Sequence, residues 1–342
     1  MQQVLVTGGS GYLASFCIAP LLEQGLSVRT TVRNLAREGE VRAAISRLVV
    51  NQDKLSFVAA DLNSDDGWAA AAAGCQGVLH VASPFHAQTT AGDEFTKTAT
   101  DGALRVIEAA LAAGAERIVL TSSIAAVSPE EIPTDRLLDE RDWTDPASPR
   151  ISPYARSKTV AESKAWEAVR ARGADKKLAV VNPGGIFGPV LGKDYSFSLR
   201  LIERLLKGDM PGVPKLGFNI VDVRDTADLH IRALMRDAAG GERFVASAGF
   251  MWIKEIADLL RREMGPMGAK VPTREAPSAM VRFMSLFDRE VRSITPELGR
   301  KKAHSGDKAR HTLGWAPRPM AETILDCARS MIDEGIVPKA AA

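Results

Sequence analysis

The sequence predicts an α/β protein of the Rossmann type, in which a doubly wound parallel sheet is covered by helices on both faces. Short apolar runs alternate with helical patterns through the first half of the chain. A glycine-rich turn at residues 7–14 follows directly after the first of these runs. Near-continuous Val, Leu and Ile at residues 4–6 and 118–120 are typical of strands that are buried on both faces.

The predicted elements follow one another in βα order. We expect strands at Gln3–Thr7, Ser27–Val32, Leu55–Ala59, Gly77–Val81, Arg117–Thr121 and Leu178–Asn182. Helical patterns lie between them, at Leu13–Gln24, Ala36–Val49, Trp68–Ala73, Gly102–Ala113 and Tyr154–Arg172.

The regular alternation ends at Pro183, after which Gly and Pro become frequent. We therefore predict a Rossmann domain over residues 1–183 and a smaller, mainly helical C-terminal region over residues 184–342. A strand at Asn219–Val223 before a helix predicts that residues 219–237 return to the first domain. The helices expected after Pro183 are Ser196–Leu206, Asp225–Met235, Ile253–Glu263 and Met320–Glu334.

The composition excludes several classes of protein. The 342 residues carry 44 basic and 42 acidic side chains, a net charge of +2, so neither nucleic acid nor a membrane surface is expected as a partner. The three cysteines are far apart in the sequence, as in a reduced cytoplasmic protein, and no His/Cys spacing suits a metal. No apolar run reaches the ~18 residues that a membrane span needs. We expect a cytoplasmic protein without a metal ion.

The glycine-rich turn indicates a dinucleotide-binding site. Gly8 and Gly11 would let backbone amides approach a pyrophosphate, and the start of the next helix adds donors and partial positive charge. Ala14 is small enough to let that helix pack against the strand. A purely structural turn is the alternative. The residues expected around the pyrophosphate are Thr7, Gly8, Ser10, Gly11, Tyr12 and Leu13.

The end of the second strand indicates which dinucleotide binds. NAD-binding proteins of this fold place a carboxylate there for the ribose hydroxyl, and this chain has none. Arg33 follows the strand instead, where a guanidinium can bind a 2′-phosphate, and Arg37 and Arg42 are close in sequence. We therefore predict NADP(H) as the cofactor, with NAD(H) less favoured. Asp61 and Leu62, after the third strand, would lie near the adenine.

Tyr154 and Lys158 form the most informative pair in the sequence. On a helix, their spacing brings both side chains to one face, about 5–6 Å apart at Cβ. A tyrosine ordinarily ionises near pH ~10, and an adjacent cation lowers that pKa. The pair therefore predicts a tyrosine that transfers a proton. A surface helix with a half-buried tyrosine is the alternative.

The fifth predicted strand ends in hydroxyl side chains. Ser122 and Ser123 follow Thr121 at the carboxyl edge of the sheet, where open α/β folds bind their ligands. A serine here can donate a hydrogen bond to a substrate carbonyl. The lack of a Gly-x-Ser-x-Gly turn and of a histidine motif argues against a nucleophilic serine. Serines that only end the strand are the alternative.

Together these motifs resemble those of the extended short-chain dehydrogenase/reductase family. Within it, the resemblance is to the dihydroflavonol-reductase-like branch, which includes microbial aldehyde and ketone reductases. The matching segments cover most of the chain: residues 7–12, 31–33, 81–84, 121–123, the Tyr154/Lys158 pair, 182–184, 187–189, 221–225 and 313–317.

The resemblance implies roles for individual residues. Ser123 would orient the substrate carbonyl, with Ser122 as the nearby alternative. Tyr154 would protonate the developing alkoxide, and Lys158 would lower the pKa of Tyr154 and hold the nicotinamide ribose. The loop at residues 81–85 would border cofactor and substrate. The cofactor contacts implied in addition are Val81, Ala82, Ser83, Thr121, Lys158, Pro183, Gly184, Ile186 and Ser198.

The chain departs from the family pattern at some positions. Many extended members carry, before Gly102, an asparagine that supports the active-site hydrogen bonds, whereas this chain has Ala, Thr and Asp at residues 99–101. Plant flavonoid reductases commonly have an asparagine at the place of Ser128, so a flavonoid substrate is not favoured. The tyrosine-containing signature of cinnamoyl-CoA reductases is also absent around Tyr154.

The remaining candidates concern the pocket and the core. We expect an apolar substrate pocket walled by Phe85, Ser128, Phe187 and Phe283, the last of which lies in an apolar helical stripe at residues 280–287. Structural roles are expected for four further polar residues: His80, His230, Asp222 and Asp225.

These predictions converge on an NADP(H)-dependent oxidoreductase of the carbonyl reductase type. It would transfer hydride between NADPH and a small aldehyde or ketone, with Tyr154 as general acid or base and residues 184–342 as the substrate-binding region. A homodimer is the oligomeric state that the family suggests. The alternatives are a nucleotide-sugar epimerase or dehydratase with tightly bound NAD, a hydroxysteroid-type dehydrogenase, and a dinucleotide-sensing regulator, which would need neither Tyr154 nor Lys158.

Overall fold

The computed structural model describes residues 1–83, 92–192, 198–287, 292 and 294–339. Within these residues the main sheet has seven strands in the order β3-β2-β1-β4-β5-β6-β9, and all neighbours run parallel. The first six follow the 3-2-1-4-5-6 order of dinucleotide-binding sheets, which confirms the predicted Rossmann fold. The strands are β1 (Gln3–Val6), β2 (Ser27–Val32), β3 (Leu55–Ala59), β4 (Gly77–His80), β5 (Arg117–Thr121), β6 (Leu178–Pro183) and β9 (Arg243–Ala246).

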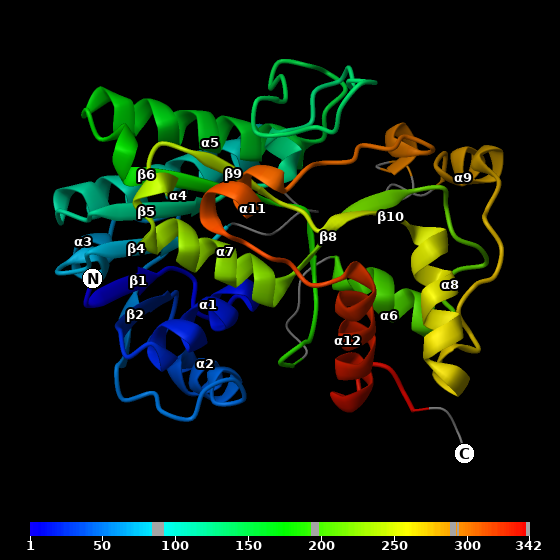
Figure 1. The fold of residues 1–342 in the computed structure, drawn as a ribbon, viewed down its shortest axis with the longest axis horizontal. Coiled ribbons are helices and arrows are strands. Elements are labelled where there is room, and N and C mark those ends of the chain that lie inside the picture. The colour runs from blue at the N-terminus through cyan, green and yellow to red at the C-terminus, as the bar shows by residue number, and fades with distance from the viewer. Residues whose placement is uncertain (84–91, 193–197, 288–291, 293, 340–342) are drawn as a thin grey trace.

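Helices cover both faces of this sheet (Figure 1). One face carries α3 (Trp68–Ala72), α4 (Gly92–Ala112) and α5 (Pro153–Ala171), and the other carries α1 (Tyr12–Glu23), α2 (Glu38–Ile45) and α7 (Val223–Met235). Each layer buries its own apolar cluster against the sheet. The central strands β1, β4, β5 and β6 are accordingly almost fully buried, whereas β2 and β3 toward the edge of the sheet carry polar residues.

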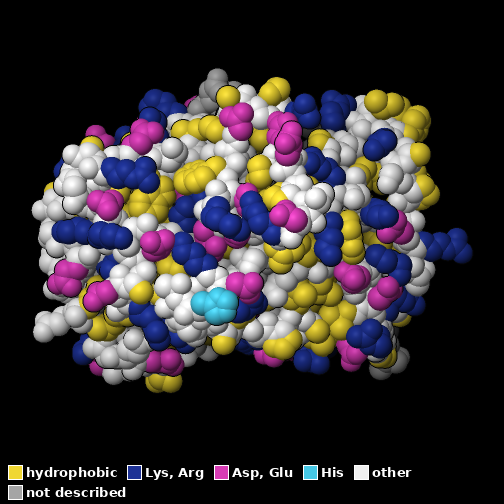
Figure 2. Space-filling model, turned by 45° about the horizontal axis from the view of Figure 1, so that its top comes forward, with side chains coloured by type: hydrophobic (Ala, Val, Ile, Leu, Met, Phe, Trp, Pro, Cys, Tyr) yellow, Lys and Arg dark blue, Asp and Glu magenta, His cyan; other side chains and the backbone are white. Residues whose placement is uncertain are grey.

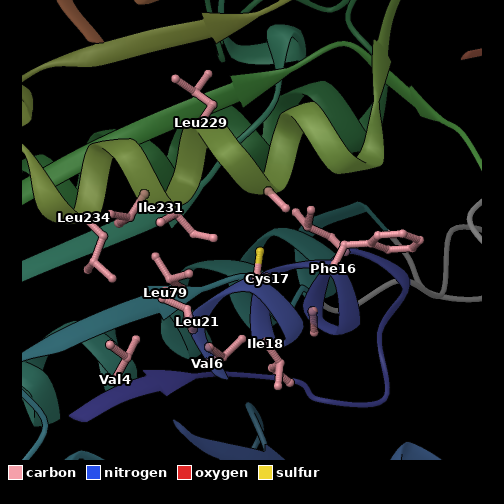
Figure 3. Close-up of a cluster of buried hydrophobic side chains, with 14 of the residues drawn as sticks. Val4, Val6, Phe16, Cys17, Ile18, Leu21, Leu79, Leu229, Ile231 and Leu234 are labelled. Carbon is pink, nitrogen blue, oxygen red and sulfur yellow. The ribbon is translucent and has the colours of Figure 1, made fainter. Parts of the chain in front are cut away.

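The apolar cluster beneath α1 and α7 holds the first helix against the sheet (Figure 3). Val6 of β1 and Leu79 of β4 lie with Cys17 and Leu21 of α1 and Leu234 of α7 in this cluster, all of them buried. Cys17 and Leu21 are one turn apart, so they share the inward face of α1. This packing fixes the start of α1 at the carboxyl end of β1.

The C-terminal region lies beyond the carboxyl edge of the main sheet (Figure 1). It has a separate apolar core and a three-stranded sheet in the order β10-β8-β7. Its strands are β7 (Gly185–Phe187), β8 (Gly217–Asp222) and β10 (Gly249–Trp252), and its helices are α6 (Leu199–Lys207), α8 (Ile253–Glu263), α9 (Ser278–Met284) and α12 (Met320–Asp333). The helix α11 (Asp307–Leu313) instead packs against β9 and α7, in the apolar cluster of the main sheet. Short 3-10 turns are η1 (Leu35–Arg37), η2 (Ile124–Ala126), η3 (Asp175–Lys177), η4 (Asp237–Ala239), η5 (Gly265–Gly268) and η6 (Thr295–Glu297).

The predicted return of residues 219–237 to the main sheet is wrong for the strand. β8 forms there but pairs with β7 and β10 of the small sheet. A Cβ on Gly184 would lie 2.4 Å from the Asn219 carbonyl oxygen, so glycine permits this close approach of β8 to the chain that leaves β6. The helix does return, because α7 packs against α1. The domain boundary at residue 183 stays a prediction.

Two helices and one strand also differ from the prediction. α4 begins at Gly92, before the expected Gly102, because Phe95 and Ala99 extend its buried face through a polar stretch. The helix expected at 36–49 is a 3-10 turn, η1, followed by the shorter α2. β9 was not predicted, and it adds a seventh strand beside β6.

The surface carries both signs of charge. On the face drawn in Figure 2, Lys and Arg side chains are interspersed with Asp and Glu and form no continuous basic area. In the described part of the chain, no helix is both long and apolar enough to cross a lipid bilayer. A cytoplasmic location stays a prediction.

Candidate active site

The glycine loop joins β1 to α1 at the carboxyl edge of the sheet. Gly8 has a φ of +71°, and a Cβ on it would lie 2.9 Å from the Cβ of Ala82. A Cβ on Gly9 would lie 2.4 Å from Thr30 Oγ1. The Gly8 amide donates to Thr31 Oγ1 (2.9 Å) and the Gly9 amide to the Thr31 carbonyl (2.8 Å), which fixes the loop. The loop therefore has no room for side chains at these two positions, and it presents backbone instead.

The start of α1 supplies backbone donors at this loop. Gly11 precedes the helix in an extended conformation, and no side chain caps it. Among the described residues, the amides of Tyr12 and Leu13 have no acceptor, and the Tyr12 hydroxyl donates to the Pro189 carbonyl at 3.1 Å. An uncapped helix start beside a tight glycine turn fits the pyrophosphate of a dinucleotide.

The arginines after β2 have different partners. Arg33 is exposed and makes no polar contact within the described residues. Arg37 donates to Ser10 Oγ of the glycine loop (3.2 Å) and pairs with Glu40. Arg42, expected to help bind the cofactor, pairs with Glu38 and donates to the Leu55 carbonyl, which is a structural role. The two arginines beside the end of β2 and the glycine loop are thus Arg33, which is exposed, and Arg37, which is held by Glu40 and Ser10.

The helix α5 brings Tyr154 to Ser123. Ser152 caps this helix by accepting the Ala155 amide at 3.1 Å, and Pro153 occupies its first turn, where a proline favours helix formation. Ser123 follows β5 and lies close enough to Tyr154 for its hydroxyl to affect the ionisation of the phenol. Two of the three predicted catalytic side chains are therefore neighbours.

Burial controls the ionisation of Tyr154. It raises the pKa of the phenol above its ordinary value, and the Ser123 hydroxyl opposes this shift. Lys158 is not among the causes of this shift, so the expectation that it lowers the pKa of Tyr154 stays a prediction. Tyr154 therefore holds its proton at neutral pH.

Lys158 contacts the ends of two strands. Its amine donates to Ser83 Oγ at 3.0 Å, after β4, and to the Thr121 carbonyl at 3.5 Å, at the end of β5. Burial lowers the pKa of Lys158 to about 8, and the Glu162 carboxylate opposes this shift. The amine is thus mainly protonated at neutral pH, although less strongly than an exposed lysine.

Sequence reasoning missed a buried ionic group behind these residues. Glu162 has no exposed surface and accepts hydrogen bonds from Ser122 Oγ (2.5 Å), Asn182 Nδ2 (2.8 Å) and Arg243 Nε (2.5 Å). Asn182 also donates to the Ser123 carbonyl at 3.1 Å. The signal for Glu162 was its place one helical turn after Lys158, whereas nothing in the sequence marks Arg243.

The other predicted contacts of the cofactor lie along the same sheet edge or beside it. Thr7 accepts the Ala82 amide at 3.1 Å, and Val81, Ala82 and Ser83 follow β4 directly. Asp61 accepts the Asn63 amide at 2.9 Å in the turn after β3, so its side chain shapes that turn. Four further residues continue from β6 toward α6: Pro183 ends β6, Gly184 donates to the Ala246 carbonyl, and Ile186 accepts Ser198 Oγ at 2.5 Å.

The predicted pocket walls are mostly not supported. Phe187 has no exposed surface and packs in the C-terminal core, edge-on to Phe218, so the prediction for it is wrong. Phe283 is 63% exposed on α9, which does not fit a covered pocket wall. Ser128 donates to the Ile124 carbonyl at 2.8 Å. Phe85 lies outside the described residues.

All four polar residues with expected structural roles have such roles. His80 is buried and its Nδ1 lies 2.8 Å from Thr7 Oγ1, and burial lowers its pKa to about 3. His230 is buried between Thr121 and the Thr226 carbonyl. Asp222 caps α7. Asp225 does not cap it but pairs with Arg318 near the chain's end, a long-range ion pair that the sequence did not reveal.

Comparisons with known proteins agree with this geometry. The sequence pattern of the NAD dependent epimerase/dehydratase family matches residues 4–247, more than half of the chain. The chain belongs to this family. This finding confirms the resemblance to extended short-chain dehydrogenases/reductases that the motifs indicated.

Individual relatives are named reductases. The chain is 35% identical to cinnamoyl-CoA reductase 1 of Arabidopsis thaliana over 251 residues, 72% of this chain and 71% of that protein. It is 36% identical to vestitone reductase of Medicago sativa over 268 residues, 75% and 80% of the two chains. The structure of the yeast methylglyoxal/isovaleraldehyde reductase Gre2 complexed with NADPH matches with a TM-score of 0.78 at 24% identity, covering 98% of this chain and 99% of that one, which supports the fold.

Proposed function

We propose that this protein is an NADP(H)-dependent carbonyl reductase that converts an aldehyde or ketone to the alcohol. The observation that carries the proposal is the adjacency of Ser123 and Tyr154, a hydroxyl and a protonated phenol, at the carboxyl end of β5. Lys158 stands on the same helix, and the glycine loop opens at the same edge of the sheet. Two hydroxyl donors beside a dinucleotide site fit the reduction of a carbonyl.

The residues that would hold the cofactor lie at the carboxyl edge of the sheet and after β2. The backbone at residues 8–13 would bind the pyrophosphate, and Arg33 with Arg37 would bind the 2′-phosphate. Lys158 would hold the nicotinamide ribose beside Ser83. The lack of a carboxylate after β2 and the NADPH in the Gre2 structure both support NADP(H) over NAD(H).

The catalytic residues have separate tasks in the proposed reaction. When bound, NADPH supplies the hydride to the carbonyl carbon. Ser123 Oγ donates a hydrogen bond to the carbonyl oxygen as charge develops there, and the Tyr154 hydroxyl gives that oxygen its proton. A raised pKa suits Tyr154 for this direction, because the phenol must be protonated before it can act as an acid. The Ser122 hydroxyl already donates its proton to Glu162, which supports Ser123 as the donor.

The test is the oxidation of NADPH, followed by its near-UV absorbance, with a panel of aldehydes and ketones. Tyr154→Phe should lower kcat by about 10²- to 10⁴-fold with little change in NADPH affinity. Lys158→Met should also lower kcat, whereas Lys164→Met on the same helix should not, because Lys164 pairs with Glu167 at the surface.

Three outcomes would contradict the proposal. If Tyr154→Phe kept full turnover, Tyr154 would not be the general acid. NAD that copurifies with the protein would favour a nucleotide-sugar epimerase or dehydratase, and NADPH binding without turnover of any substrate would favour a dinucleotide-sensing regulator. The substrate class within the carbonyls, and the homodimer, stay predictions.

A further inference from the structure

Glu162 continues a line of functional side chains along α5. Tyr154, Lys158 and Glu162 are spaced by four residues each, so they lie on one face of the helix. Glu162 is the deepest of the three, with no exposed surface, while Lys158 is half-buried. A buried carboxylate one turn from the lysine is a fixed charge in a region of low dielectric, where its effect is larger than in water.

Glu162 and Lys158 also face a common cavity. This cavity has a volume of about 20 Å³, enough for one water molecule, and its polar lining includes Lys158, Glu162, Ser122 and His80. The helix α4 contributes only small apolar residues to the lining in the described structure, Ala99 and Ala103. Lys158 and Glu162 therefore line the same small space, which Leu62 and Leu120 close on other sides.

The charged groups around the cavity leave Glu162 as the source of negative charge. His80 of β4 is neutral at physiological pH, with a pKa of about 3, and Tyr154 holds its proton. Arg243 of β9 is positive and bonded to Glu162 from the other side. Among the residues that line the cavity in the described structure, Glu162 is the one that carries a negative charge.

Arg243 prevents the carboxylate from moving. Its guanidinium donates to the carbonyls of Ala126, Glu140 and Asp142 and stacks on the Trp143 ring at 3.6 Å. These contacts hold the ion pair between the sheet and the segment at residues 124–144 that follows Ser123. Because both charges are buried and fully bonded, the pair is rigid.

We propose that Glu162 is a positioning residue that keeps Lys158 protonated across this cavity and fixes the Ser122–Ser123 turn through its bonds to Ser122 and Asn182. The proposal rests on the proposed function, since it assigns Glu162 a task for the Lys158 of that site. It predicts that the charge of Glu162, and not only its shape, is required.

The test measures the titration of Lys158 directly and needs no turnover. Trace acylation with acetic anhydride across a pH series, read by peptide mass spectrometry, reports the protonation of each lysine. In Glu162→Gln, which keeps the shape but removes the charge, the midpoint for Lys158 should fall by about one pH unit or more. In Glu162→Asp, which keeps the charge, most of the wild-type midpoint should be retained.

A buried arginine without its partner can prevent folding. The double variant Glu162→Gln with Arg243→Gln removes both charges, and the Lys158 midpoint should fall in it as well. Glu140→Gln is the matched control, because Glu140 is a partly buried carboxylate that accepts the Val245 amide away from the cavity. That control should lose stability without moving the Lys158 midpoint.

The outcomes separate this inference from the proposed function. An unchanged Lys158 midpoint in Glu162→Gln, or in the double variant, would overturn the inference even if the wild type reduces carbonyls. A wild type that reduces no carbonyl would overturn the proposed function, while the midpoint would still report on Glu162. If both the inference and the proposed function are correct, the alkaline limb of the pH profile of kcat/KM should move to lower pH in Glu162→Gln. The size of this move should equal the change in the Lys158 midpoint.

Discussion

The glycine loop and the helix α5 meet at one edge of the sheet but are stabilised in different ways. In the loop, backbone amides bond to Thr31, and the key positions exclude side chains altogether. On α5, Glu162 forms a buried ion pair with Arg243, and we propose that the protonation of Lys158 depends on the charge of Glu162. Close packing around its glycines therefore shapes the glycine loop, whereas buried charge is the main feature of the part of the site on α5.

This difference indicates how each half should respond to substitution. A loop that offers only backbone is insensitive to charge and pH but has no room for an added methyl group. A site built on side chains tolerates small changes of volume but depends on which protons are bound. The following experiments separate the two halves, beginning with the largest expected effect.

Ser123→Ala should lower kcat by about 10²- to 10³-fold, because it removes one of the two donors to the developing oxyanion. NADPH affinity should change little, since the glycine loop is untouched. Steady-state NADPH oxidation and a fluorescence titration of NADPH measure the two quantities. Ser46→Ala, at the exposed end of α2, is the control. A Ser123→Ala enzyme with normal kcat would shift the donor role away from this residue.

Gly9→Ala should weaken NADPH binding by about tenfold or more and destabilise the protein by about 1–3 kcal/mol, because its Cβ would meet Thr30. Gly39→Ala in α2 is the matched control, since a Cβ there meets nothing within 4 Å. That variant should be neutral or slightly more stable. Thermal unfolding and NADPH titration provide the comparison, and equal behaviour of the two variants would contradict the steric account of the loop.

Arg33→Gln should weaken NADPH binding by about tenfold and leave NADH binding nearly unchanged, because only the 2′-phosphate distinguishes the two. Arg262→Gln, an exposed arginine paired with Glu263 on α8, is the control. The ratio of the two dissociation constants, rather than either alone, is the measurement. An equal loss for both cofactors would place Arg33 elsewhere than at the 2′-phosphate.

The pH dependence of kcat/KM should show that the part of the site on α5 depends on charge. The pKa of Lys158 is lowered to about 8, so its protonated form prevails below that pH and is lost above it. If protonated Lys158 is required, kcat/KM for reduction should fall by about fivefold between pH 8 and pH 9. NADPH binding through the glycine loop should vary less over that range. A flat profile up to pH 10 would contradict the requirement for the charged amine.

The sequence by itself determined the parts of this protein that rest on short-range order. The βα alternation predicted the first six parallel strands to within a residue at each end, because strand and helix periodicities are local. The glycine loop and the Tyr154/Lys158 pair were equally readable, since a tight turn and a helical spacing involve neighbouring residues. Phe187 shows the limit of this approach, because an apolar residue can serve a pocket or a core equally well.

Only the tertiary structure decided what depends on burial and on distant segments. Arg243 reaches Glu162 across 81 residues, and β8 leaves the main sheet because β7 and β10 offer it partners. The raised pKa of Tyr154 is likewise a consequence of desolvation, which no spacing in the sequence reports. Periodicity identifies which residues share a helix or a strand, but the dielectric and the partners of a charged group arise only when the chain folds around it.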